Sequence, residues 1–114
     1  MSSPVMTIDV AHPPRGPAVV EEDILDAWTA VRNSPQVRIL KVIHGYGSSG
    51  VGGATRDTVR NWAYVNRGKF RAVIHGEDYA LLDPATDAMR REAGGYPDTD
   101  LSARNPGVTV IWVK

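Results

Sequence analysis

A histidine followed closely by several glycines is the feature of this sequence with the clearest chemical potential. Val42 and Ile43 lead into His44, and five glycines follow between positions 45 and 53. Glycine lets main-chain N–H groups approach a phosphate closely, and the N-terminus of a helix that follows such a loop attracts anions. The imidazole of His44 could exchange protons with the bound group. The segment therefore predicts a phosphate-binding loop with an acid–base residue at its edge.

The elements that must position this loop follow from the spacing of apolar residues. Helical spacing extends over residues 17–33 and 55–66. Strand-like segments are expected at four places, residues 5–10, 37–43, 70–74 and 108–113. Residues 77–106 form an acidic insert, in which Asp83 and Pro84 indicate the start of a short helix that Gly94 ends. We expect one domain over residues 1–114 with the order β-α-β-α-β-(helical insert)-β.

The connections predict how the strands are arranged. Helical crossovers make the first three strands parallel, so the expected fold class is α/β, a two-layer α/β sandwich with a mostly parallel four-stranded sheet. Ligands of such sheets bind at the carboxyl ends of the strands. The three histidines, His12, His44 and His75, each follow one of these strands. We therefore expect them to share one functional edge.

Composition and charge narrow the class of protein. The chain has 114 residues, no cysteine and 42% apolar residues, with no apolar run long enough for a membrane span. These features, and an N-terminus unlike a signal peptide, predict a cytoplasmic protein without a membrane partner. The net charge is zero, but residues 27–76 carry eight basic side chains and one acidic one. A basic block around the glycine loop favours a phosphate-bearing partner.

Several motifs together resemble the Smr (small MutS-related) domain family. In that family a strand ends in His-Gly-x-Gly and a helix beginning Leu-Arg-x-x-Val follows; here residues 44–47 read His-Gly-Tyr-Gly and residues 55–59 read Thr-Arg-Asp-Thr-Val. Residues 7–10 resemble its Leu-Asp-Leu-His-Gly motif, and residues 106–110 resemble its closing Gly-x-Thr strand. The family's first-motif histidine aligns with Ala11, and the nearest histidine is His12. The resemblance spans most of the chain and implies a small α/β sandwich whose mixed sheet packs on two helices.

The resemblance also implies a function. Smr domains are linked to nucleic acid, and several are nicking or structure-selective endonucleases on DNA or RNA. Position by position, Asp9 would be the acidic residue of the first motif and Arg56 the helix arginine. In the expected mechanism His44 is the general base or acid, and His12 or His75 is the second proton donor. Asp9 would orient a histidine or hold a divalent cation, magnesium or manganese.

The residues expected to contact nucleic acid come from the glycine loop and the helix after it. Main-chain N–H groups and arginines would hold the phosphate, and the tyrosine between two glycines could stack on an unpaired base. This set comprises Gly45, Tyr46, Gly47, Ser48, Ser49, Gly50, Arg56 and Arg60.

Three other functions stay open at the level of sequence. The first is a non-catalytic nucleic-acid-binding or adaptor module that has lost cleavage. The second is a metal hydrolase whose zinc is held by the three histidines. The third is dinucleotide binding, because residues 45–50 match G-x-G-x-x-G, but the acidic residue expected about 20 positions further on is missing. The sequence indicates no particular oligomeric state.

Overall fold

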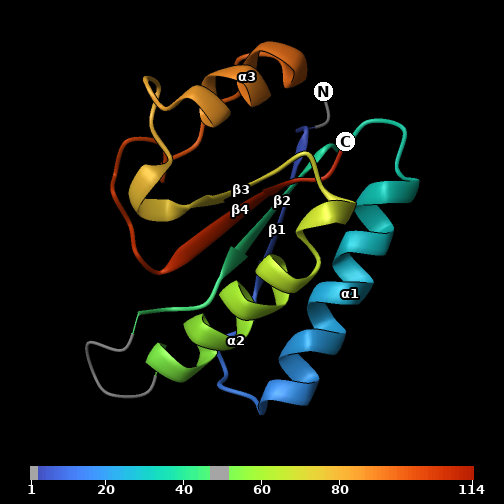
Figure 1. Ribbon diagram of the computed structural model, residues 1–114, viewed down its shortest axis with the longest axis vertical. Coiled ribbons are helices and arrows are strands. Elements are labelled where there is room, and N and C mark those ends of the chain that lie inside the picture. Colours follow the sequence, from blue (N-terminus) through green and yellow to red (C-terminus); the bar gives the residue numbers. More distant parts are fainter. Residues whose placement is uncertain (1–2, 47–51) are drawn as a thin grey trace.

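One four-stranded sheet with helices on both faces makes up the protein (Figure 1). The computed structural model describes residues 3–46 and 52–114. The strands are β1 (Val5–Asp9), β2 (Ile39–Ile43), β3 (Ala72–His75) and β4 (Val108–Trp112). The helices are α1 (Pro17–Asn33), α2 (Gly52–Val65) and α3 (Pro84–Ala93), with short 3-10 turns at Arg67–Lys69 and Gly76–Asp78. These elements form close to where the periodicity predicts them.

The helices begin and end for local reasons that the sequence carries. Pro17 occupies the start of α1, where its missing N–H costs nothing. Asp83 caps α3, because its side chain accepts a hydrogen bond from the N–H of Thr86 at 3.0 Å. The cap fixes where α3 starts, and with it the course of the acidic insert.

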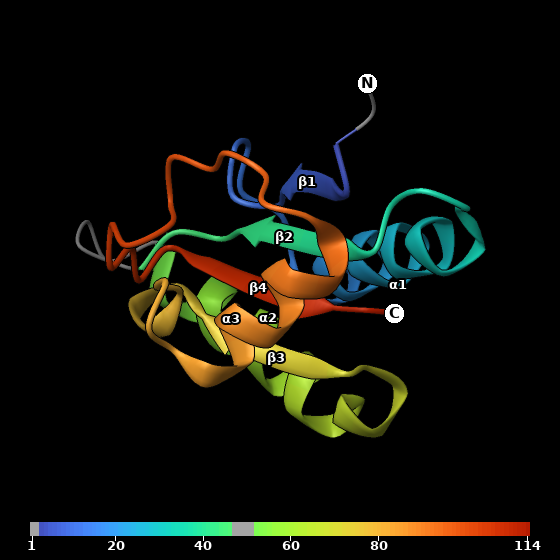
Figure 2. The same ribbon diagram turned by 90° about the horizontal axis from the view of Figure 1, so that it is seen from above.

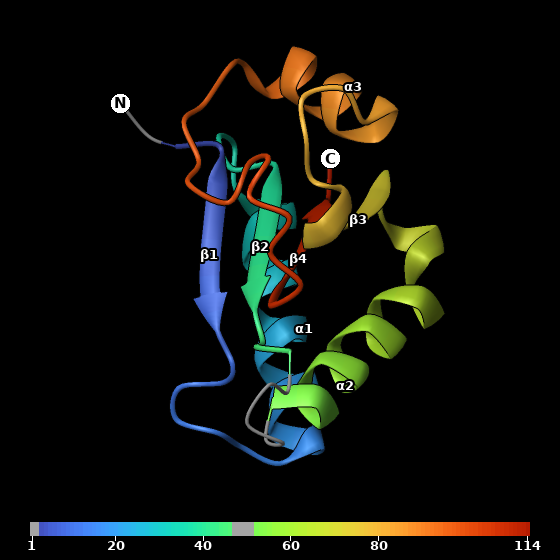
Figure 3. The same cartoon turned by 90° about the vertical axis from the view of Figure 1, so that its left-hand side faces the viewer.

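The order of the strands in the sheet is β1-β2-β4-β3, which Figure 3 shows from the side. β1 and β2 are parallel, whereas β4 is antiparallel to both of its neighbours, β2 and β3. The expectation of a mostly parallel sheet is therefore corrected to a mixed sheet with one parallel pair among three. β1, β2 and β3 point the same way, but β4 lies between β2 and β3 and runs in the opposite direction, and its complete burial fits this central position.

The acidic insert adds a layer that the two-layer expectation lacks. α1 and α2 cover one face of the sheet, where Val20, Ile24 and Val59 lie in the core. The insert covers the opposite face with Tyr79 and Met89, both fully buried. Figure 1 shows α3 and α1 on opposite sides of the sheet, and in Figure 2 the segment after α3 passes β2 before it enters β4. The insert is thus part of the core.

Candidate functional site

An aspartate and a histidine form a pair just after β1. The Oδ1 atom of Asp9 accepts hydrogen bonds from the main-chain N–H groups of Ala11 at 2.8 Å and His12 at 3.0 Å. Its Oδ2 atom lies 2.9 Å from Nδ1 of His12. Because an ionised carboxylate only accepts hydrogen bonds, Nδ1 carries the proton, and Nε2 of the neutral ring carries the free lone pair. The pair therefore presents an oriented proton acceptor.

The surroundings of this pair keep Asp9 ionised and leave the His12 ring open to solvent. Partial burial favours the neutral acid, but the N–H donors of Ala11 and His12 and the His12 ring outweigh it and hold the pKa of Asp9 below its ordinary value. The His12 side chain is 75% exposed, and within the described chain Nε2 has no hydrogen-bond partner. Nε2 is thus open to solvent.

The turn after β1 also explains why His12 lies within hydrogen-bond distance of Asp9. In an Asx turn an aspartate side chain binds main-chain N–H groups two and three residues ahead, which curls the chain back over it. Here that curl brings His12, one position beyond the motif position held by Ala11, onto Asp9. The spacing of three residues between Asp9 and His12 is the signal in the sequence.

His44, the histidine before the glycine loop, lies in a different environment. It is 0% exposed, its Nδ1 atom is 2.6 Å from the carbonyl oxygen of Gly45, and its Nε2 atom is 2.8 Å from Oγ1 of Thr109. Burial lowers the pKa of His44 to about 4, and the charges of Arg60 and Arg56 act in the same direction. The ring is neutral, donates from Nδ1 to the carbonyl group and accepts the Thr109 hydroxyl at Nε2. Both nitrogens are occupied, so His44 ties the loop to β4.

The first residues of the glycine loop are held by the same strand. The N–H groups of His44 and Gly45 both donate to the carbonyl oxygen of Gly107, at 2.8 and 3.1 Å, so they do not face a phosphate. Gly45 has a φ of 74°, which favours glycine. Tyr46 is 48% exposed and remains free to stack on a base. The predicted contacts Gly47, Ser48, Ser49 and Gly50 lie outside the described residues.

The two arginines predicted to hold phosphate differ in their availability. Arg60 binds Glu77 through two guanidinium nitrogens, at 2.6 and 3.1 Å, and its Nε atom donates to Thr109 at 3.3 Å. The hydrogen bonds from Arg60 lower the pKa of Glu77 to about 2, so this pair stays ionised. Arg56 is half-buried and has no ion-pair partner among the described residues. Arg56 is therefore the freer cation.

His75 does not join the Asp9 and His12 pair. It is exposed at the end of β3, where burial of part of its ring and the charge of Arg60 lower its pKa. Three strand intervals separate β1 from β3 in the sheet, which is about 14 Å at the usual spacing. One phosphate cannot touch both ends of that distance. The predicted edge thus holds two groups, Asp9 with His12, and His44 with Arg60.

The sequence did not predict a buried charged cluster on the face of the sheet that the insert covers. The Nζ atom of Lys41 lies 2.8 Å from Oδ1 of Asp98 and 2.7 Å from Oδ2 of Asp100, and Asp98 also accepts from the Tyr79 hydroxyl at 2.9 Å. The signal is a lysine inside the apolar strand β2, since a buried cation needs partners. The cluster fastens the insert to the sheet.

The positive charge is distributed differently from the prediction of one basic surface. Three cations of the basic block, Lys41, Arg60 and Arg71, pair with acids of the insert. Arg67 and Lys69 follow α2 and lie at the far end of that helix, about 20 Å from the end that adjoins the glycine loop. The carboxyl edge of the sheet therefore carries less free positive charge than the sequence suggests.

The described residues form no ready-made site for a divalent cation. Both carboxylate oxygens of Asp9 already accept hydrogen bonds. Over residues 3–46 and 52–114 there is no group of three or more histidine, aspartate or glutamate side chains placed to hold a metal ion. Neither the magnesium or manganese site nor the three-histidine zinc site is supported by this geometry. In the same part of the chain, no helix is long and apolar enough to cross a membrane.

Comparisons of this chain with protein-family models, with curated proteins and with solved structures find no match.

Proposed function

We propose that this chain is a Smr-like nucleic-acid-binding protein that cleaves phosphodiester bonds, with His12 as the proton-transfer residue and Asp9 as the residue that orients it. The observation that carries the proposal is the hydrogen bond between Nδ1 of His12 and Asp9 at 2.9 Å, on an imidazole that is 75% exposed. A carboxylate on one nitrogen fixes the tautomer, so that the other nitrogen accepts a proton from the nucleophile.

The chemistry of this pair favours RNA as the substrate. A single histidine base is well matched to a nucleophile that is already part of the substrate, because proximity lowers the barrier. In RNA the 2′-hydroxyl attacks the phosphorus, its proton passes to Nε2 of His12, and the bond to the 5′-oxygen breaks. Water protonates the leaving oxygen, and the products are a 2′,3′-cyclic phosphate and a 5′-hydroxyl end. Arg56 would balance the charge on the phosphate oxygens.

A non-catalytic binding module is the second candidate, and a specific observation favours it. Two groups expected to act on the phosphate, His44 and Arg60, are occupied by Thr109 and Glu77 in the folded chain. Tyr46 and Arg56 could still bind an unpaired nucleotide by stacking and charge. Such a module would retain nucleic acid in a salt-sensitive way without cutting it.

One experiment separates these functions. The purified protein is incubated with supercoiled plasmid, branched DNA and structured RNA, each with EDTA, with magnesium or with manganese. The proposal expects cleavage of RNA in EDTA, with 2′,3′-cyclic phosphate ends and no cleavage at a 2′-deoxy position. Retention of nucleic acid that weakens with salt, without cleavage in any condition, would leave the binding module.

A further inference from the structure

β1 is an edge strand; on its outer side the N–H of Val5 donates to Oγ of Ser3 at 3.1 Å, whereas Thr7 has no main-chain partner within the described chain. The carbonyl oxygen of Pro4 accepts from the N–H groups of Arg38 and Ile39, and the N–H of Val10 donates to Ile43. In a strand both main-chain groups of one residue point to the same side, and the side alternates. The main-chain groups of the even-numbered residues of β1 therefore point toward β2. The N–H and C=O of Thr7 point outward, where the described residues offer no partner strand.

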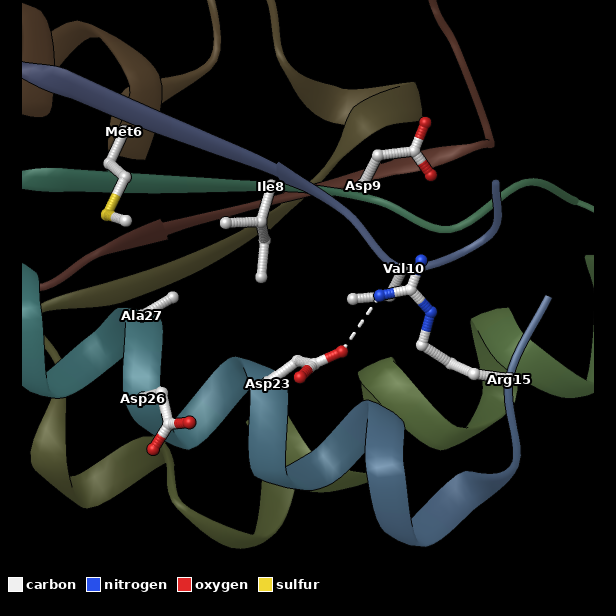
Figure 4. A pocket seen from close by; sticks show the side chains of 8 residues that line it. All are labelled: Met6, Ile8, Asp9, Val10, Arg15, Asp23, Asp26 and Ala27. Carbon is white, nitrogen blue, oxygen red and sulfur yellow. Dashed lines mark hydrogen bonds and ion pairs between the residues drawn. The ribbon is translucent and has the colours of Figure 1, made fainter. Parts of the chain in front are cut away.

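A groove runs beside this open edge, between β1 and α1. Its volume is about 440 Å³, and Figure 4 shows Met6 and Ile8 pointing from β1 toward α1, with Ala27 below them. On the helix side Asp23 points to Arg15, and Figure 4 shows the carboxylates of Asp26 and Asp9 directed away from the space between β1 and α1. The groove thus has an apolar floor, and its helix side carries Arg15, Asp23 and Asp26.

The charged residues that line the groove are mostly acidic: Asp9, Asp23 and Asp26, against one arginine, Arg15. Glu21 and Glu22 add negative charge on the same helix, α1. Arg15 is already paired with Asp23 at 2.9 Å. Glu22 and Asp26 are exposed and make no ion pair with any described residue. A second copy of β1 would bring acid against acid, whereas a cationic partner is complementary.

We propose that β1 and α1 form a docking site for an extended, basic peptide segment of another protein, which adds to the sheet as a fifth strand beside β1. Main-chain hydrogen bonds to Thr7 would give affinity, and alternate side chains would give specificity. Lysine or arginine side chains that point toward α1 would lay their aliphatic stems on Met6 and Ile8 and place their charged ends near Asp26. This site does not depend on phosphodiester cleavage, and its test uses no nucleic acid.

A direct test uses labelled peptides and two substitutions. The probes are an acetylated peptide of alternating lysine and threonine and its counterpart of alternating glutamate and threonine, followed by fluorescence anisotropy at low salt. Thr7→Pro removes the outward N–H that the peptide needs, and proline is tolerated at that side of an edge strand. Asp26→Lys reverses a charge on the helix side of the groove, and Asp57→Lys makes the same change on the exposed face of α2.

The proposal expects saturable binding of the lysine peptide, at least tenfold weaker with Thr7→Pro and at least fivefold weaker with Asp26→Lys. Asp57→Lys should bind as the parent does, and the peptide should slow amide hydrogen exchange at Thr7. Three results would overturn the proposal: equal binding of the glutamate peptide, no saturable binding by the parent, or a folded Thr7→Pro protein that binds as the parent does. If Thr7→Pro does not fold, Asp26→Lys decides, and unchanged binding by that variant overturns the proposal.

Discussion

His44 and His75 both stand at the end of an apolar strand and precede a glycine, yet their environments in the fold differ. Both ring nitrogens of the fully buried His44 are bonded, whereas the exposed side chain of His75 makes no hydrogen bond to the described residues. The direction of each side chain and the neighbours it meets depend on the register with β4, which a local pattern does not contain. His12, in contrast, lies at the surface, where the Asx turn at Asp9 holds it against that carboxylate, and this is why we propose it as the proton-transfer residue.

The buried histidine should matter for stability more than for chemistry. His44→Ala removes two hydrogen bonds: the carbonyl of Gly45 loses its donor, and the hydroxyl of Thr109 loses the acceptor of its proton while it still accepts from Arg60. We expect it to lower the free energy of unfolding by roughly 2–4 kcal/mol, as measured by urea denaturation. His75→Ala is the matched exposed control and should change stability by less than about 0.5 kcal/mol. Equal effects of the two substitutions would contradict the structural role of His44.

Among the elements, the acidic insert makes most of the contacts that the sequence did not predict. Its carboxylates cross the molecule to reach cations far away in the sequence, as in the pairs of Lys41 with Asp98 and Asp100. It also fills one face of the sheet with Tyr79 and Met89. The insert therefore completes the core and neutralises part of the basic block.

The lysine cluster gives a test of how the insert is held. Lys41→Met leaves Asp98 and Asp100 largely buried without a cation, and we expect it to destabilise the protein by roughly 3–5 kcal/mol in urea denaturation. The triple variant Lys41→Met, Asp98→Asn, Asp100→Asn removes the uncompensated charge and should recover a large part of that loss. If the single variant were as stable as the parent, the cluster would not hold the insert.

Glu77 gives a test of whether the insert restrains Arg60. Glu77→Gln removes the charge that occupies this guanidinium and should strengthen binding of a labelled RNA hairpin by about three- to tenfold at low salt, measured by fluorescence anisotropy. Asp78→Asn changes the neighbouring exposed carboxylate, which has no ion pair in the described chain, and should alter binding much less. The same affinity for both variants would mean that Glu77 does not compete with RNA.

The elements themselves were largely predictable, because helices and strands depend on local spacing. α1 follows from its apolar stripe, and α3 from Asp83 and Pro84. The sheet order was not predictable in this way, since β4 pairs with strands that are distant in sequence. The site was predictable only in part: Asp9 and His12 are close in the chain, whereas Glu77 and Thr109 reach Arg60 through tertiary packing.

At the scale of the whole molecule, stability should fall in acid in two stages. Burial keeps the pKa of His44 near 4, below its ordinary value of 6.5. Below pH 6.5 this imidazole therefore binds a proton in the unfolded chain but not in the folded chain. That difference removes roughly 3 kcal/mol between pH 6.5 and 4. The carboxyls with lowered pKa, among them Glu77 and Asp100, then lose their stabilising charge as the pH falls further.

The first stage can be assigned to one residue. The free energy of unfolding is measured by urea denaturation at intervals from pH 7 to pH 4 for the parent and for His44→Gln. A glutamine has no proton to gain, so the decline over this range should become much shallower. A decline of equal size in both proteins would show that other groups cause it.

The most direct measurement compares two exposed histidines in one cleavage assay. The parent, His12→Ala and His75→Ala are incubated with a structured RNA in EDTA, and the fragments and their 2′,3′-cyclic phosphate ends are quantified. We predict that His12→Ala reduces the rate by at least about 100-fold, because the general base is lost, and that His75→Ala reduces it much less. Cleavage by the parent that His12→Ala retains in full would contradict the role assigned to the Asp9 and His12 pair.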